Sequence, residues 1–150
     1  MTELTGKCHC GKNKFSISAK PEFQFICYCS NCRVINSGGH LCGMLFDSNQ
    51  LSEAEETQTY TYKGGSGNPI IMHFCPTCAT QLYAYPTEHK DKVVIRANTL
   101  VDSDFKPHQA IFTESAFHWD NPIVKDSCKK ESPKLESKSG SEHKVSCHFV

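Results

Sequence analysis

The sequence predicts a β-dominated protein in which short strands are connected by turns that carry cysteines. Nearly all of its periodic segments are short and alternate apolar with polar residues, which is the pattern of a half-buried strand. No helical pattern of ten or more residues is present. Seven of the ten cysteines are separated from another cysteine by only one or two residues. Packing of side chains into a core does not explain cysteines spaced so closely in such short segments.

Three strands are predicted in the first third of the chain. Residues 14–18 and 23–27 both alternate apolar side chains with polar neighbours, and the second of these segments ends on a cysteine. Residues 40–46 form the third strand, after an Asn-Ser-Gly-Gly turn signal at 36–39. Residues 51–56 are expected to form one short helical turn.

The remaining strands follow the same alternation, and we place them at residues 57–62, 70–74, 81–85, 93–96 and 108–112. Two of them flank a Cys-Pro-Thr-Cys segment, which predicts a hairpin with this segment at its tip. From about residue 126, Lys, Glu and Ser dominate, and such a composition cannot offset its ordering entropy by burial. We therefore predict a domain at 1–125 and a polar, low-complexity, disordered tail at 126–150.

Length and charge narrow the classes of partner. A chain of 150 residues can bury one ordinary core. Lys and Arg together number 16, as do Asp and Glu, so no basic face suited to nucleic acid is expected. No apolar run approaches the roughly 18–20 residues that span a bilayer, and the polar start lacks a signal-peptide pattern. We expect a cytoplasmic protein without nucleic-acid or membrane partners.

The cysteine spacing favours metal binding over disulfides. Cysteines this close together seldom satisfy disulfide geometry, and in a reducing cytosol such pairs more often bind metal. The Cys8-x-Cys10 pair and the Cys75-x-x-Cys78 pair supply four sulfurs, which is the ligand set of a closed structural zinc site. Such an ion would join two distant turns and contribute directly to folding.

The remaining cluster is the candidate functional site. Cys27, Cys29 and Cys32 provide three sulfurs without an obvious fourth ligand. Catalytic zinc sites keep one position open, and a thiol bound there would lose its proton and be prepared as a nucleophile or leaving group. The alternative is a structural site closed by a fourth protein ligand, for which the candidates are His9, His40 and Cys42.

The order of these motifs resembles the glutathione-dependent formaldehyde-activating enzyme family, whose domain is shared with centromere protein V. The resemblance covers about residues 4–120. It is carried by Gly6-x-Cys8-x-Cys10-Gly11, Cys27-x-Cys29-Ser30-x-Cys32-Arg33 and Phe74-Cys75-x-x-Cys78, and it continues through Gln81-Leu82-Tyr83, Val94-Ile95-Arg96-Ala97 and Ile111-Phe112-Thr113-Glu114-Ser115 to Trp119.

The resemblance implies a β-tent fold built of small antiparallel sheets and stapled by zinc. It implies a structural zinc on the four-cysteine set and a second zinc on the three-cysteine set. The family's reaction joins formaldehyde to glutathione to give S-hydroxymethylglutathione, formally a carbon–sulfur lyase reaction in reverse. We therefore expect a lyase acting on glutathione or its adduct. The residues expected to bind glutathione, and the candidates for general acid or base, are named by proximity in the sequence alone and are Ser30, Asn31, Ser37 and His40.

One departure from the family pattern concerns the backbone, and two other functions stay open. Ala79 follows the second cysteine pair at a position where glycine is usual in the family. Glycine would accept a positive φ in this turn, and alanine, which has a Cβ atom, is expected to be strained there. The chain could instead be a non-catalytic, zinc-stabilised protein-binding module. The three-cysteine cluster could also serve as a redox or metal-buffering site, since clustered thiolates oxidise readily.

Overall fold

The computed structural model describes residues 3–120 and 127–128. These residues form two compact units, one from residues 3–24 and 42–106 and the other from residues 25–41, 107–120 and 127–128. The β-dominated fold predicted from the sequence is confirmed, and every predicted strand is present with its ends within one residue of the prediction.

The first unit begins with a three-stranded antiparallel sheet in the order β1-β2-β5. Its strands are β1 (Leu4–Lys7), β2 (Lys14–Ile17) and β5 (Leu51–Ser52). β1 is too short and too polar to be recognised by alternation alone. The helical turn expected at residues 51–56 is wrong, because Leu51 pairs with Ile17 and extends the sheet. A 3-10 helix, η1 (Ser48–Gln50), lies just before it.

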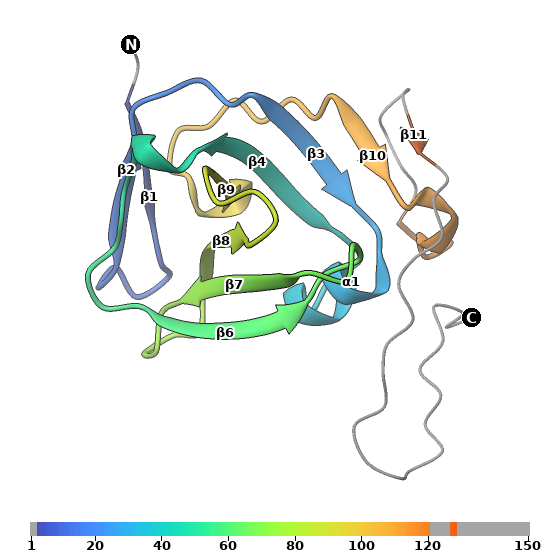
Figure 1. The fold of residues 1–150 in the computed structure, drawn as a ribbon, viewed down its shortest axis with the longest axis horizontal. Helices are drawn as coiled ribbons and strands as arrows, with labels where there is room; N and C mark the ends of the chain where they lie inside the picture. The colour runs from blue at the N-terminus through green and yellow to red at the C-terminus, as the bar shows by residue number, and fades with distance from the viewer. Residues whose placement is uncertain (1–2, 121–126, 129–150) are drawn as a thin grey trace, which may run out of the picture. The chain divides into compact units, whose positions relative to one another are not determined.

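The other strands of this unit follow one another as antiparallel neighbours. In spatial order they are β4 (Leu41–Asp47), β9 (Lys92–Arg96), β8 (Gln81–Pro86), β7 (Pro69–Phe74) and β6 (Gln58–Lys63). A 3-10 helix, η2 (Ala97–Thr99), follows β9. β7 and β8 run side by side and form the predicted hairpin with the Cys75–Cys78 turn at its tip (Figure 1).

The core of the first unit is apolar and includes two cysteines. Phe15 stacks edge-on against Tyr83, with ring centroids 5.5 Å apart. Cys8 and Cys75 are buried in the same cluster, so their sulfurs are shielded from water. The core of this unit includes the apolar side chains Phe15, Ile17, Phe46, Leu82, Tyr83, Val93 and Ile95.

The second unit combines short parallel strands with one helix. β3 (Phe23–Cys27) enters this unit at Phe25 and pairs in parallel with β10 (Gln109–Ile111), which also pairs in parallel with β11 (Ser127–Cys128). A 3-10 helix, η3 (Thr113–Ser115), follows β10. The seven-residue helix α1 (Ser30–Asn36) was not predicted, because it is shorter than the ten or more residues over which a helical pattern can be recognised.

The predicted turn at 36–39 is present, and Ser37 ends α1 in a left-handed conformation with φ of 51°. Among the described residues, no helix is both long and apolar enough to cross a membrane. The tail predicted at 126–150 falls outside the described residues, apart from the two residues of β11.

Candidate metal centres

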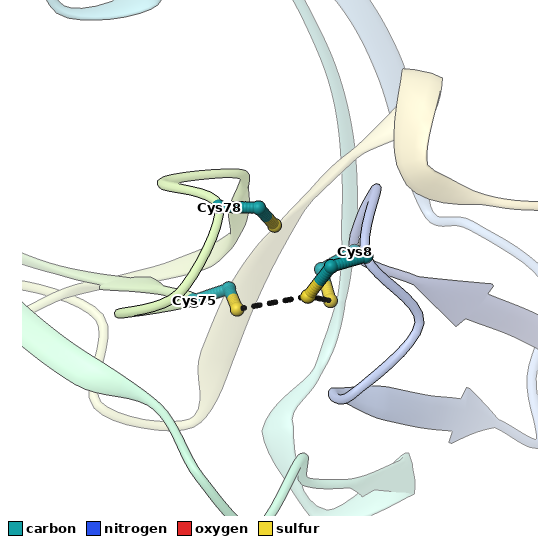
Figure 2. Close-up of side chains that lie close together, drawn as sticks. Cys8, Cys75 and Cys78 are labelled. Carbon is teal, nitrogen blue, oxygen red and sulfur yellow. Dashed lines mark hydrogen bonds between the residues drawn. The ribbon is translucent and has the colours of Figure 1, made fainter.

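Four cysteines from two distant turns converge in the first unit. Cys8 and Cys10 lie on the turn between β1 and β2, and Cys75 and Cys78 lie at the tip of the β7–β8 hairpin. The Sγ atom of Cys10 lies 3.5 Å from that of Cys8 and 3.7 Å from that of Cys75. All four Sγ atoms lie within 4.8 Å of one another. Figure 2 shows the sulfurs of Cys8, Cys75 and Cys78 pointing toward a common centre.

Backbone hydrogen bonds shape both turns so that the sulfurs face inward. In the first turn, the N–H of Gly11 donates to the carbonyl of Cys8 at 3.1 Å, and Gly11 has a φ of 79°. In the second turn, the N–H of Ala79 donates to the carbonyl of Cys75 at 2.8 Å, and Ala79 has a φ of 61°. Ala79 thus adopts the conformation that the sequence comparison with the family predicted for this position.

Polar neighbours favour the thiolate form of Cys78, whereas at Cys10 the hydrogen bond from the Lys12 backbone is outweighed by burial and the neighbouring cysteines, which raise the pKa to about 11. The backbone N–H of Asn13 donates to Sγ of Cys8 at 3.3 Å. The hydroxyl of Thr80 lies 3.2 Å from Sγ of Cys78. This hydroxyl, followed by the N–H groups of Cys10 and Thr80, lowers the pKa of Cys78 to about 5. Because metals bind the thiolate, these contacts prepare the cluster for an ion.

The second cluster lies where β3 meets α1. Cys27 ends the strand, Cys29 is the N-cap of the helix and Cys32 lies in its first turn. Their Sγ atoms lie within 4.8 Å of one another. Cys27 and Cys29 are only 3% and 5% exposed, in a cluster with Leu41. Backbone hydrogen bonds fix the segment, since the N–H of Tyr28 donates to the carbonyl of Ile111 at 3.0 Å.

The negative charge of this cluster concentrates on Cys29. Its Sγ atom accepts a hydrogen bond from the backbone N–H of Cys32 at 3.4 Å. Hydrogen bonds from the thiols of Cys27 and Cys32, together with backbone N–H groups, lower the pKa of Cys29 to about 3. The hydrogen bond to Cys29 raises the pKa of Cys27 to about 12. A protein sulfur that is already anionic is suited to bind a cation.

No fourth ligand joins Cys27, Cys29 and Cys32 within the described part of the chain. Of the three residues considered for this role, His40 is paired with Asp120, and its Nδ1 atom lies 2.6 Å from Oδ2 of that residue. Cys42 packs against the core of the first unit. His9 lies on the turn of the four-cysteine cluster, where its backbone N–H donates to the Thr80 hydroxyl.

The other predicted site residues take different positions around α1. Ser30 and Asn31 open the helix, and Ser30 is buried. Ser37 caps the opposite end and is exposed. Sequence reasoning missed Asp120, because 80 residues separate it from His40 and no spacing motif connects the two.

Comparisons with known proteins agree with the two clusters and the fold. The family model described as glutathione-dependent formaldehyde-activating enzyme matches residues 3–115. A crystal structure of a Rhodobacter sphaeroides protein is similar in fold, with a TM-score of 0.53 and 20% sequence identity, over 67% of this chain and 90% of that chain. A search of proteins with curated functions finds no match. Since the family model spans most of the chain and includes all seven clustered cysteines, the chain belongs to the glutathione-dependent formaldehyde-activating enzyme family.

Proposed function

We propose that this protein is a zinc-dependent enzyme of the carbon–sulfur lyase type, acting on glutathione or on a glutathione adduct of an aldehyde. The observation that carries the proposal is the group of three cysteines at the start of α1, two of them buried and Cys32 half-buried, to which no fourth ligand is added among the described residues. A family named for glutathione and formaldehyde supplies the class of substrate.

Both cysteine clusters fit zinc by the chemistry of their donors. Zn–S bonds of about 2.3 Å in a tetrahedron separate the sulfurs by about 3.8 Å. The separations of 3.5 and 3.7 Å between Sγ of Cys10 and the sulfurs of Cys8 and Cys75 are close to this value. A complete set of four cysteine ligands is typical of structural zinc, so we assign this cluster a structural role that joins the β1–β2 turn to the β7–β8 hairpin.

The three-cysteine cluster would hold its ion through Cys27, Cys29 and Cys32. Zinc bound there would supply a Lewis acid that keeps a substrate thiol in its thiolate form. The protein buries Cys27 and Cys29, which keeps water away from their sulfurs, and fixes all three cysteines through the backbone of β3 and α1. In the synthetic direction, the substrate sulfur forms a bond to the aldehyde carbon, the carbonyl π bond breaks, and the oxygen gains a proton. Cleavage reverses each change.

The test compares two cysteine substitutions. Cys29→Ser removes the anionic sulfur of the three-cysteine cluster, whereas Cys42→Ala removes a thiol that belongs to neither cluster. We expect Cys29→Ser to abolish formation of S-hydroxymethylglutathione, measured by NMR, and to lower the zinc content from two ions to one. Cys42→Ala should keep both the turnover and the two ions.

Two results would contradict the proposal. The first is a Cys29→Ser variant whose turnover stays within twofold of the wild-type value. The second is a wild-type protein in which X-ray absorption finds both ions closed by protein ligands and unchanged by glutathione. That second result would instead support a non-catalytic binding module.

A further inference from the structure

His40 and Asp120 form a hydrogen-bonded pair that the sequence did not reveal. Nδ1 of His40 donates to Oδ2 of Asp120 at 2.6 Å. The two side chains are 33% and 17% exposed, so the pair is shielded but accessible. When Nδ1 carries the proton, the lone pair of the neutral ring lies on Nε2. A carboxylate behind a histidine also stabilises the imidazolium that forms when Nε2 accepts a proton.

The surrounding chain is built to hold this pair. A Cβ atom on Gly39 would lie 2.0 Å from Oδ2 of Asp120, so only glycine lets the carboxylate reach His40. The side-chain amide of Asn36 donates to the carbonyl of His40 at 2.8 Å, which fixes the histidine to the end of α1. The backbone N–H of Asp120 donates to the carbonyl of Phe117 at 2.9 Å, which closes the turn that presents the carboxylate.

The same helix connects the pair to the three-cysteine cluster. The guanidinium of Arg33, the residue after Cys32, lies 4.1 Å from the centre of the Phe117 ring. This cation–π contact holds the Asp120 turn against α1. On the other side, the ring of His40 lies 5.3 Å from the ring of Tyr28, which stands between Cys27 and Cys29 in the chain.

We propose that His40 is the catalytic acid–base residue of the three-cysteine site and that Asp120 is its positioning residue. The inference rests on the function proposed above. Nε2 of His40 accepts the proton that the substrate thiol loses on binding, and it delivers this proton to the carbonyl oxygen as the sulfur–carbon bond forms. The sulfur electron pair becomes the new bond, the π pair moves to oxygen, and the imidazole returns to its neutral form.

Adjacent glycines provide a matched pair of variants. Gly39→Ala pushes a methyl group into the Asp120 carboxylate without removing any titratable group. At Gly38 the nearest atom to an added Cβ lies at 3.8 Å, so Gly38→Ala leaves the pair undisturbed. Asp120→Asn, Asp120→Glu and His40→Ala complete the set. The assay measures kcat and KM with glutathione and formaldehyde, after zinc content and circular dichroism establish that each variant is folded.

We expect His40→Ala to lower kcat by about 10²- to 10⁴-fold, with partial recovery on adding imidazole. Gly39→Ala and Asp120→Asn should each lower kcat by about 10- to 100-fold, the range typical of groups that orient a functional side chain. KM for glutathione should stay within twofold in all three variants. Gly38→Ala should match the wild type, and Asp120→Glu should recover part of the activity lost in Asp120→Asn.

The outcomes separate this inference from the proposed function. If Cys29→Ser abolishes turnover while Gly39→Ala and Asp120→Asn keep wild-type kcat, the proposed function stands and the role of the pair is overturned. Losses that fall only on KM, or equal losses in Gly38→Ala and Gly39→Ala, would overturn it as well. If the wild type is no faster than Cys29→Ser, the proposed function fails, and this inference fails with it.

Discussion

Replacing Ala79 by glycine should stabilise the protein, although most alanine-to-glycine changes do the opposite. Ala79 has a φ of 61°, and its N–H closes the cysteine turn by donating to the carbonyl of Cys75. The left-handed conformation costs an L-residue roughly 1–2 kcal/mol, and glycine is free of that cost. Against this gain, the greater conformational entropy of glycine stabilises the unfolded chain by about 0.4–1 kcal/mol. The net gain expected for Ala79→Gly is about 0.5–1 kcal/mol.

The assay is urea unfolding of the zinc-loaded protein, followed by circular dichroism at fixed total zinc. The matched control is Ala116→Gly, because Ala116 has a φ of −63° and gains nothing from glycine. We expect the unfolding midpoint to rise in Ala79→Gly and to fall in Ala116→Gly. In thermal unfolding, the gain corresponds to an increase of about 1–4 °C in Tm. A decrease in Ala79→Gly as large as that in Ala116→Gly would refute the assignment of strain to this turn.

Three further predictions concern packing, charge and metal. Gly6→Ala should lower the free energy of unfolding in urea by about 1–3 kcal/mol, because the new Cβ would lie 2.1 Å from the buried ring of Phe15. If the double variant Gly6→Ala/Phe15→Leu recovers none of this loss, the contact with Phe15 is not its cause. Lys92→Met should lower the unfolding midpoint at low salt and less so in 1 M NaCl, since Lys92 bonds to Glu22 at 2.7 Å and Asp47 at 2.6 Å and salt screens such pairs; an effect independent of salt would contradict this. A chelator should remove zinc in two phases, the first from the three-cysteine cluster without loss of circular dichroism; release in one step with unfolding would be the contrary result.

Most of the fold was predictable because its strands follow a simple rule. Alternation of apolar and polar residues located eight strands, and the Cys75–Cys78 spacing located the hairpin tip. The errors fall on short elements. β5 has only two residues and owes its conformation to pairing with β2. Pairing with a strand so far away in the sequence cannot be predicted from the local residue pattern. The helix α1 has only seven residues, and its start is set by Cys29, whose sulfur acts as N-cap by accepting a hydrogen bond from the N–H of Cys32.

The candidate site was predictable only where its residues are close in sequence. The cysteine clusters could be found because their spacing is itself the signal, and Ala79 could be recognised because a family glycine indicates a backbone requirement. Asp120 carries no such signal. It reaches His40 through the turn after Phe117 and through the absence of a side chain at Gly39, and both are properties of the folded chain.

The two clusters present the same donor atom, and they differ in what holds the sulfurs. In the four-cysteine cluster, each turn supplies two sulfurs, and an ion there completes its ligands while joining elements 65 residues apart. In the three-cysteine cluster, a single strand–helix junction supplies all three sulfurs, so the backbone already fixes their positions. An ion in that second cluster has no distant segments to join. Under the function we propose, an ion in the three-cysteine cluster would therefore exchange a fourth ligand without disturbing the fold, which is the property that a thiol-binding site requires.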